Sequence, residues 1–440
     1  MHNHYKSIHR PRGKDLGLPE LIAIALGGMV GGGIFTILGI AVSMIGMLTP
    51  VAIIIGGIIA AMAAYSYVKL GLYYRDEGAT YSFYKKTYAG NPFAASVIGW
   101  FVIFGYISTL ALYAYTFSSY AISGFSFGND IWIRKGVAVG ILVLFTLINI
   151  WSVNGMGKLE DLMVYTKLVI LTLISVVLIN HSNVDTATFM QHLKADAGSS
   201  GILNVLIVAS ITFVAYEGFQ LVINAVNEMK QPEKNIPRAI YTAIVLAILI
   251  YIIIAAGALL AIPVNDIIQN QEYALAAGAK DALGNTGRNL VILGAILATS
   301  SAISGTVFGS SRQMAVIAND GYMPALLAKR KNHIPVNAIL MMAFFAAVLI
   351  LIGGLQLILE FGSVTFLLVS LLMALANFKI RKLTKSSDGI TLLSIIGLLI
   401  GGGLILYYEI THKPGQMVFI ACLYGLLTLA AWLYAKYERK

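Results

Sequence analysis

The chain has 440 residues, of which 58% are hydrophobic and only 11% are charged. Because an average soluble protein carries about 25% charged residues, this composition cannot cover a water-facing globule with polar side chains. It excludes a soluble enzyme, a disordered chain and a disulfide-stabilised secreted protein. The single cysteine, Cys422, also excludes an internal disulfide and a thiolate metal site.

Twelve stretches are long and apolar enough to cross a bilayer, since a spanning helix needs roughly 20 apolar residues. The first is too long and too rich in glycine for a cleaved signal peptide. The segments between the stretches are too short for a soluble domain. We therefore expect an all-α integral membrane protein with twelve transmembrane helices, preceded by a tail over residues 1–17. The predicted spans are 18–45, 48–70, 93–123, 136–154, 159–180, 202–226, 237–262, 288–313, 334–354, 355–378, 390–408 and 415–436.

The basic residues predict the orientation of the chain. Of the 30 Lys and Arg residues, 23 lie on the side of the two termini and six lie in the opposite loops. Basic residues concentrate in cytoplasmic loops, so both termini are expected to be cytoplasmic. We expect a multi-pass protein of the cell (plasma) membrane, and specifically of a prokaryotic inner membrane. The net charge of +10 is therefore interpreted as an orientation signal, and no nucleic-acid partner is expected.

The first and sixth spans are interrupted. Five glycines fall between Gly27 and Gly33, and each costs a helix about 1 kcal/mol relative to alanine. Their spacing also fits close helix packing of the GxxxG type, which can coexist with unwinding. Residues 213–219 form a second polar, glycine-marked interruption in the sixth span. We interpret both interruptions as unwound segments.

The two interruptions occupy equivalent positions in two sets of five spans. Helix-like runs ending at Asn91 and Asn285 also match. Transporters are often built from two such halves with inverted topology. We predict one repeat over residues 18–180, a second over 202–380, and two added helices with the C-terminal tail over 390–440.

The unwound centres have a chemical use. A half-helix starting after Gly33 presents free N–H groups and a positive dipole end, which suit a carboxylate. A half-helix ending near Val214 presents free carbonyl groups, which suit an ammonium group. A zwitterion satisfies both, so an α-amino acid is the expected substrate.

Two ionisable residues lie well inside the predicted spans, Lys167 and Glu217. Lys167 is eight residues into its span, roughly 12 Å deep at 1.5 Å per residue. It could reach back to the interface, pair with backbone carbonyls as a structural cation, or lose and regain a proton where a metal cation would otherwise sit. Glu217 could bind a substrate amine, keep Lys167 charged, or cap the broken helix.

Several other kinds of site are not expected. All seven histidines lie in tails or loops, so none can relay protons at mid-membrane. The chain has neither an H-E-x-x-H motif nor a phosphate-binding G-x-x-x-x-G-K-[ST] loop. We therefore expect neither an enzyme nor an ATP-driven pump, with no metal site and no cofactor.

Four segments resemble motifs of the amino acid–polyamine–organocation (APC) superfamily, in the same order and on the same membrane sides. Residues 28–35 resemble its span-1 pattern G-x-(I/V)-G-x-G-I-F, and residues 213–219 its span-6 pattern F-x-A-Y-x-G-F. Residues 228–239 and 311–324 are similar to its cytoplasmic patterns after spans 6 and 8. The resemblance covers spans 1 to 10 and is closest to the ApcT-type proton-coupled amino acid transporters, which carry a lysine in span 5 where Lys167 lies.

This resemblance implies a LeuT-like fold with a 5+5 inverted repeat, and uptake coupled to protons instead of sodium. It implies that Lys167 bonds the Gly27 carbonyl and a hydroxyl of span 8, Ser300 or Ser301. Phe213 resembles a gate over the substrate. One departure is that ApcT-like proteins more often have an apolar residue at the position of Glu217, whose charge would disfavour anionic substrates. The residues implied to line the substrate are Met29, Gly31, Gly32, Gly33, Val214, Ala215 and Glu217.

The resulting hypothesis is a secondary active amino acid transporter, a proton symporter that works by alternating access. A proton-independent exchanger or facilitator is the main alternative, followed by an amine or polyamine transporter. The expected partners are the amino acid substrate and the lipid bilayer. The preferred amino acid and the oligomeric state do not follow from the sequence.

Overall fold

The computed structural model describes residues 16–76, 78–151, 153–180, 186–226, 229–331 and 334–437. Every long element in these ranges is an α-helix, which confirms the all-α prediction. The predicted N-terminal tail up to residue 15, with its three histidines, lies outside the described residues.

All twelve predicted spans correspond to helices. In the described part of the chain, ten helical segments are long and apolar enough to cross a membrane, and one of them, Gly33–Tyr74, joins two spans. The spans are α1 (Leu18–Met29) with α2 (Gly33–Ile45), α3 (Thr49–Tyr74), α5 (Pro92–Ile122), α6 (Ile131–Trp151), α7 (Val153–Asn180), the end of α8 (Thr186–Thr212) with α9 (Leu221–Asn224), α10 (Pro232–Ala261), most of α12 (Ala274–Asn319), α13 (Val336–Ile352), α14 (Leu355–Lys379), α15 (Asp388–His412) and α16 (Pro414–Tyr437).

Glycines with positive φ separate the spans from short flanking helices. α8 bends at Gly201 (φ 67°) and α12 at Gly284 (φ 67°), so each consists of two helices. α4 (Ala79–Thr87) is followed by Gly90 (φ 86°). The helix-like runs predicted before Asn91 and Asn285 are therefore helices. Each ends near a glycine whose positive φ is a backbone conformation that favours glycine over other residues.

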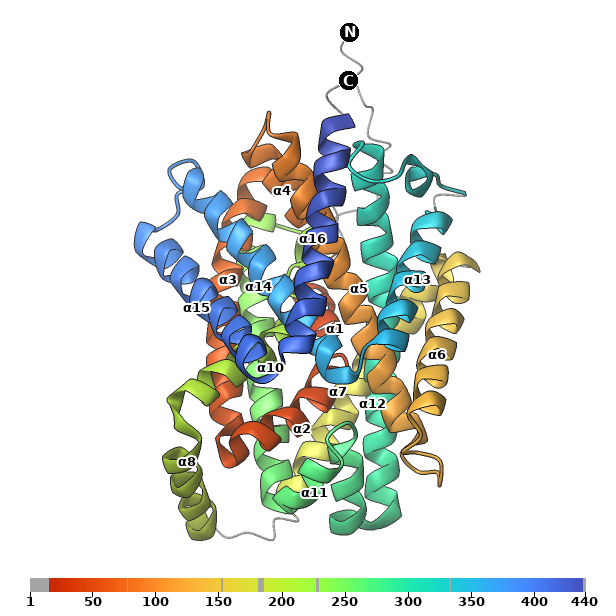
Figure 1. The fold of residues 1–440 in the computed structure, drawn as a ribbon, viewed down its shortest axis with the longest axis vertical. Coiled ribbons are helices and arrows are strands. Elements are labelled where there is room, and N and C mark those ends of the chain that lie inside the picture. Colours follow the sequence, from red (N-terminus) through yellow and green to blue (C-terminus); the bar gives the residue numbers. More distant parts are fainter. Residues whose placement is uncertain are drawn as a thin grey trace.

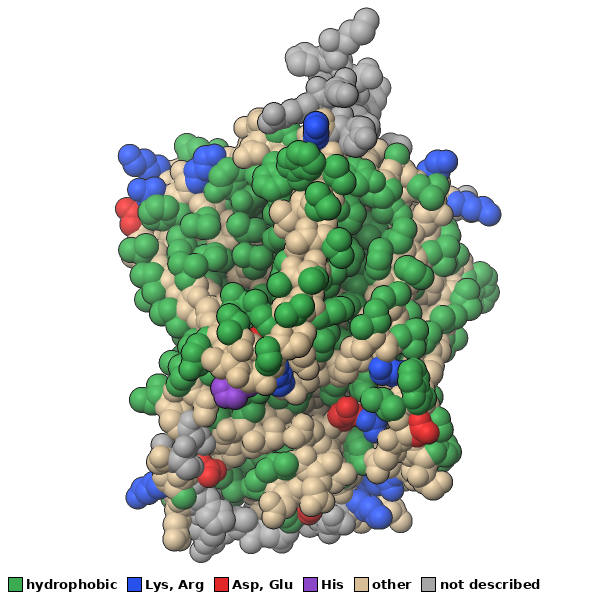
Figure 2. Space-filling model, in the orientation of Figure 1, with side chains coloured by type: hydrophobic (Ala, Val, Ile, Leu, Met, Phe, Trp, Pro, Cys, Tyr) green, Lys and Arg blue, Asp and Glu red, His purple; other side chains and the backbone are tan. Residues whose placement is uncertain are grey.

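The helices form one bundle with distinct ends (Figure 1). α4 and the C-terminal end of α16 lie at one end, and the first part of α8 and α11 (Val264–Gln269) lie at the other. Figure 2 shows a broad band of hydrophobic side chains, with Lys and Arg gathered above it and charged side chains of both signs below it. Such a band matches the apolar layer that a bilayer would cover.

α6 begins at Ile131, earlier than the predicted residue 136. Arg134 and Lys135, which were expected in a loop, lie within its first turns and are buried. Arg134 forms an ion pair with Glu272, and Lys135 Nζ donates a hydrogen bond to the Leu351 carbonyl at 2.8 Å. Because both cations have partners, the helix can extend past them.

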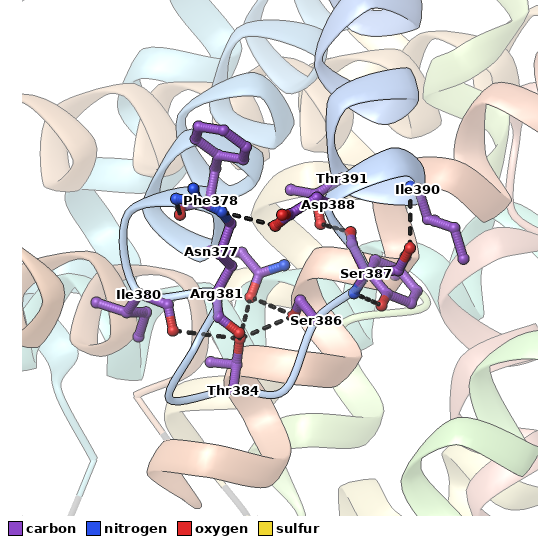
Figure 3. A network of polar contacts seen from close by, with 11 residues as sticks. Asn377, Phe378, Ile380, Arg381, Thr384, Ser386, Ser387, Asp388, Ile390 and Thr391 are labelled. Carbon is purple, nitrogen blue, oxygen red and sulfur yellow. Dashed lines mark hydrogen bonds and ion pairs between the residues drawn. The ribbon is translucent and has the colours of Figure 1, made fainter.

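A polar network closes the turn between α14 and α15 (Figure 3). Asn377 Oδ1 accepts hydrogen bonds from Thr384 Oγ1 at 2.9 Å and from Ser386 Oγ at 3.0 Å. Arg381 Nε lies 2.6 Å from Asp388 Oδ1. These bonds fix the turn at the boundary predicted between residues 380 and 390.

The centre of the bundle is built around α1 and the end of α8. α1 packs against α10, α12 and α7, and α8 packs against α3, α15 and α14. Residues at both breaks, including Met29 and Val214, are buried, so the unwound segments lie in the interior.

Candidate functional site

The first span is unwound at its glycine run, as expected. α1 ends at Met29 and α2 begins at Gly33. Side chains at the glycines would collide with neighbours: a Cβ on Gly31 would lie 2.8 Å from the Tyr113 ring, and one on Gly33 would lie 2.9 Å from Ala215 Cβ. The glycines therefore let the unwound segment lie directly against α5 and the sixth span.

The sixth span is unwound opposite the first. A 3₁₀ turn over Phe213–Tyr216 is followed by extended Glu217 and by Gly218 at φ 125°. A Cβ on Gly218 would overlap the carbonyl carbon of Gly28 and lie 2.7 Å from the Met29 nitrogen. The two breaks are thus in backbone contact, a pairing of Gly28 with Gly218 that sequence reasoning missed.

The predicted lining residues all lie at these breaks. They are buried, and Phe213 stands at the start of the 3₁₀ turn with no exposed surface. The set is Met29, Gly31, Gly32, Gly33, Val214, Ala215 and Glu217.

Tyr251 of α10 joins the two breaks. Its hydroxyl lies 2.8 Å from the Met29 carbonyl oxygen and 2.9 Å from the Ala215 carbonyl oxygen. A hydroxyl has one proton, so the two carbonyls share a single donor. The sequence contains 23 tyrosines, and nothing in the pattern around Tyr251 distinguishes it from the others.

Replacing Tyr251 with phenylalanine is expected to slow amino acid uptake about fivefold, because the shared hydrogen bond between the breaks is worth about 1 kcal/mol. Tyr216→Phe is a matched control, since that buried hydroxyl donates only to the Ile53 carbonyl, at 2.7 Å. Initial uptake rates in proteoliposomes provide the measurement. Equal losses in the two variants would contradict a bridging role for Tyr251.

Lys167 lies at the end of α1. Its side chain has no exposed surface, and Nζ donates hydrogen bonds to the Gly27 carbonyl at 2.9 Å and the Val30 carbonyl at 2.8 Å. A cation is favoured there because the last carbonyls of a helix are unpaired and carry partial negative charge. Gly27 was a predicted partner, and Val30 was not.

Ser300 and Ser301, the other predicted partners of Lys167, are buried in α12. This helix packs against both α1 and α7, which carries Lys167. The two serines therefore belong to the helix that closes this side of the bundle.

Glu217 is held by Gln220. Glu217 Oε2 accepts a hydrogen bond from Gln220 Nε2 at 2.7 Å, and Gln220 Oε1 accepts one from the Gly218 N–H at 3.0 Å. The other oxygen, Oε1, is buried and receives no donor from the residues that the structure describes. Gln220 thus caps the break and orients the carboxyl group, a role that sequence reasoning did not assign.

A small cavity adjoins the breaks. Its volume is about 20 Å³, which suffices for roughly one water molecule and not for an amino acid. The arrangement is therefore a closed one, with the two breaks packed together. Most of the cavity walls come from spans whose facing could not be predicted; the lining residues are Gly28, Tyr106, Thr109, Tyr113, Glu217, Gly218, Leu221, Gly305, Thr306, Ser310 and Phe366.

Comparison with known proteins places the chain in a family. The chain matches, over residues 16–434, the family model described as amino acid permease. An uncharacterized protein of Methanocaldococcus jannaschii is 27% identical over 422 residues, 94% of each chain. The inner membrane transport protein YbaT of Escherichia coli is 31% identical over 318 residues, 72% of each chain. A cationic amino acid transporter 7, chloroplastic, of Arabidopsis thaliana is 26% identical over 374 residues, 81% of this chain and 63% of the relative.

The family match covers both interrupted helices and every continuous span around them. Its members are transporters and not enzymes, in agreement with the expectation from the sequence. The chain belongs to the amino acid permease family of the APC superfamily and is an amino acid transporter embedded in a membrane.

Proposed function

We propose that this transporter is a proton-coupled amino acid symporter that works by alternating access, with substrate bound at the unwound centres of the first and sixth spans. The observation that supports it best is the Lys167 ammonium group, which is bonded to two carbonyls at the broken end of α1. A protonated amine in this position takes the place of a metal cation, so no sodium ion is required.

The helix ends supply the two halves of a zwitterion site. The first N–H groups of α2, from Gly33 onward, can receive a carboxylate. The Ala215 carbonyl and Glu217 can receive an ammonium group. Because the cavity beside the breaks has a volume of only about 20 Å³, substrate entry requires the two breaks to separate, with Phe213 as the gate.

The proton acts through the strength of the Lys167 bonds. Hydrogen bonds from a charged donor are roughly twice as strong as those from a neutral one. Loss of the proton therefore weakens the link between α7 and α1. The two inverted repeats are predicted over residues 18–180 and 202–380. We infer that weakening this link lets the first two spans of each repeat rock against the remaining spans. Substrate release occurs toward the cytoplasm, the side on which the distribution of basic residues predicts both termini.

Glu217→Gln tests which substrates the site accepts. A carboxylate about 4 Å from a like charge costs on the order of 1–4 kcal/mol, depending on the local dielectric. We expect the affinity ratio of anionic to neutral amino acids to rise at least about fivefold in the variant. Competition against labelled alanine uptake measures this ratio, and an unchanged ratio would mean that the Glu217 side chain does not face the substrate.

Uptake of labelled amino acids into proteoliposomes tests the function itself. Neutral amino acids are expected to compete for uptake at micromolar to millimolar concentration. Amines that lack a carboxylate are expected not to compete, because they offer no hydrogen-bond acceptor to the N–H groups of α2. Competition by polyamines would support an amine transporter. Counterflow that is equally fast with and without a pH gradient, and insensitive to external pH, would support an exchanger or facilitator.

A further inference from the structure

Two carboxyl groups and an ammonium group gather where α14, α15 and α16 meet. Glu360 of α14 and Glu409 of α15 have no exposed surface. Lys413, in the turn between α15 and α16, places Nζ 2.9 Å from Glu360 Oε1. In Figure 1 this turn lies at the ends of α15 and α16 that point away from α4, well inside the height of the bundle. None of the three residues lines the breaks or the cavity beside them.

The hydrogen bonding of this cluster is incomplete. The Glu409 carboxyl lies within hydrogen-bonding reach of the Glu360 carboxyl. Within the described ranges, however, no donor reaches Glu360 Oε2 or either oxygen of Glu409. Two ionised carboxylates cannot bond each other, because both only accept. One proton between them would supply the missing donor.

The charge of the cluster is also unbalanced. Glu360 and Glu409 together carry two negative charges when ionised, and Lys413 supplies one positive charge. An uncompensated charge is costly to bury, because its interaction with water is lost. Binding one proton makes the cluster neutral.

In the part of the chain that the structure describes, the helices packed against this end of α14 and α15 bring no other charged residue to the cluster, and α5, which packs against α14, has only tyrosines as ionisable groups. α15 packs against α14, α3, α8 and α16. Along α14 the next ionisable residue is Lys379, at the opposite end of the helix. α3 has none before Tyr65, α8 has none after Asp196, and α16 has none before Cys422.

Two more groups lie in the turn at the end of α15. The Lys413 ammonium lies 5.3 Å from the centre of the Tyr408 ring, and His412 stacks on that ring. His412 Nδ1 is hydrogen-bonded to Thr411 Oγ1 at 2.7 Å and its side chain is exposed. The histidine is therefore engaged at the surface, apart from the buried carboxyl pair.

We propose that Glu360 and Glu409 bind a single proton between them, forming a proton site separate from Lys167. The shared proton holds α15 against α14. α14 in turn contacts the sixth span beside its break, because Ser363 Oγ donates to the Ile211 carbonyl at 2.7 Å. It also contacts α5, since Ser108 Oγ donates to the Ile358 carbonyl at 2.7 Å. Loss of the proton in alkaline medium would leave two facing carboxylates and push these helices apart.

Infrared difference spectroscopy of the purified full chain, titrated from acid to alkaline pH, tests the proposal directly. A protonated carboxyl group has its own carbonyl stretching band, which disappears on ionisation. We expect Glu409→Gln and Glu360→Gln each to remove the same component of this band. In either variant the one remaining carboxylate is balanced by Lys413 and needs no proton. Glu217→Gln serves as the matched control, because it replaces a buried carboxyl group outside the cluster and is expected to leave this component in place.

Lys413→Gln provides a test of opposite sign. Without the ammonium group two negative charges must be neutralised, so the component is expected to grow about twofold. This gain cannot arise from misfolding. A component that neither Glu360→Gln nor Glu409→Gln removes would overturn the site. A component removed by only one of these two substitutions would overturn the sharing of the proton.

Discussion

Replacing Lys167 with alanine is expected to abolish amino acid uptake driven by a pH gradient. The substitution removes two hydrogen bonds from a charged donor, each worth about 1.5–3 kcal/mol. At 1.4 kcal/mol per factor of ten, the rate should fall at least about a hundredfold. The measurement is uptake into proteoliposomes with an acidic exterior, compared with uptake at equal pH on both sides.

Lys382→Ala is the control for this variant. Lys382 is an exposed residue in the turn between α14 and α15, so its loss changes the net charge by the same amount without touching the breaks. Its uptake should match that of the unmodified protein. If Lys167→Ala protein still accumulates substrate in proportion to the pH gradient, Lys167 does not couple the proton to transport.

Replacing Gly218 with alanine is the second substitution with a large expected effect. Gly218 has φ 125°, which residues with a Cβ rarely adopt, and such strain costs about 1–3 kcal/mol. The new Cβ would also overlap the Gly28 carbonyl carbon, and overpacking adds typically about 1–3 kcal/mol. We expect a lower melting temperature in detergent and at least about a tenfold loss of uptake.

Gly140→Ala is the matched control, because a Cβ at this exposed position of α6 meets no atom within 4 Å. Gly140 lies within a helix, where alanine is the better helix former. The control should keep its melting temperature or gain slightly. Equal behaviour of the two alanine variants would contradict the close backbone contact between the breaks.

Much of the fold could be predicted because its signals are local. Apolar length marks each span, and the glycine density between Gly27 and Gly33 marks the first break. A charge far inside an apolar stretch identifies Lys167 without any knowledge of the neighbouring helices. These features depend on the residues themselves and on their spacing along one helix.

The missed features depend on how helices face one another. Tyr251, Gln220 and the contact of Gly28 with Gly218 join segments far apart in sequence or use side chains with no distinctive spacing. The start of α6 was missed because Arg134 and Lys135 resemble loop residues until their partners are known. Such contacts follow from tertiary packing, which periodicity along a single helix does not encode.

Proton movement accompanying amino acid entry is the most direct test of the proposed coupling. Proteoliposomes that contain a trapped pH-sensitive dye, with no initial pH gradient, are given an external amino acid. The lumen is expected to acidify as labelled amino acid enters, and Lys167→Ala vesicles should show neither signal. Entry of the amino acid into unmodified vesicles at constant internal pH would contradict proton symport.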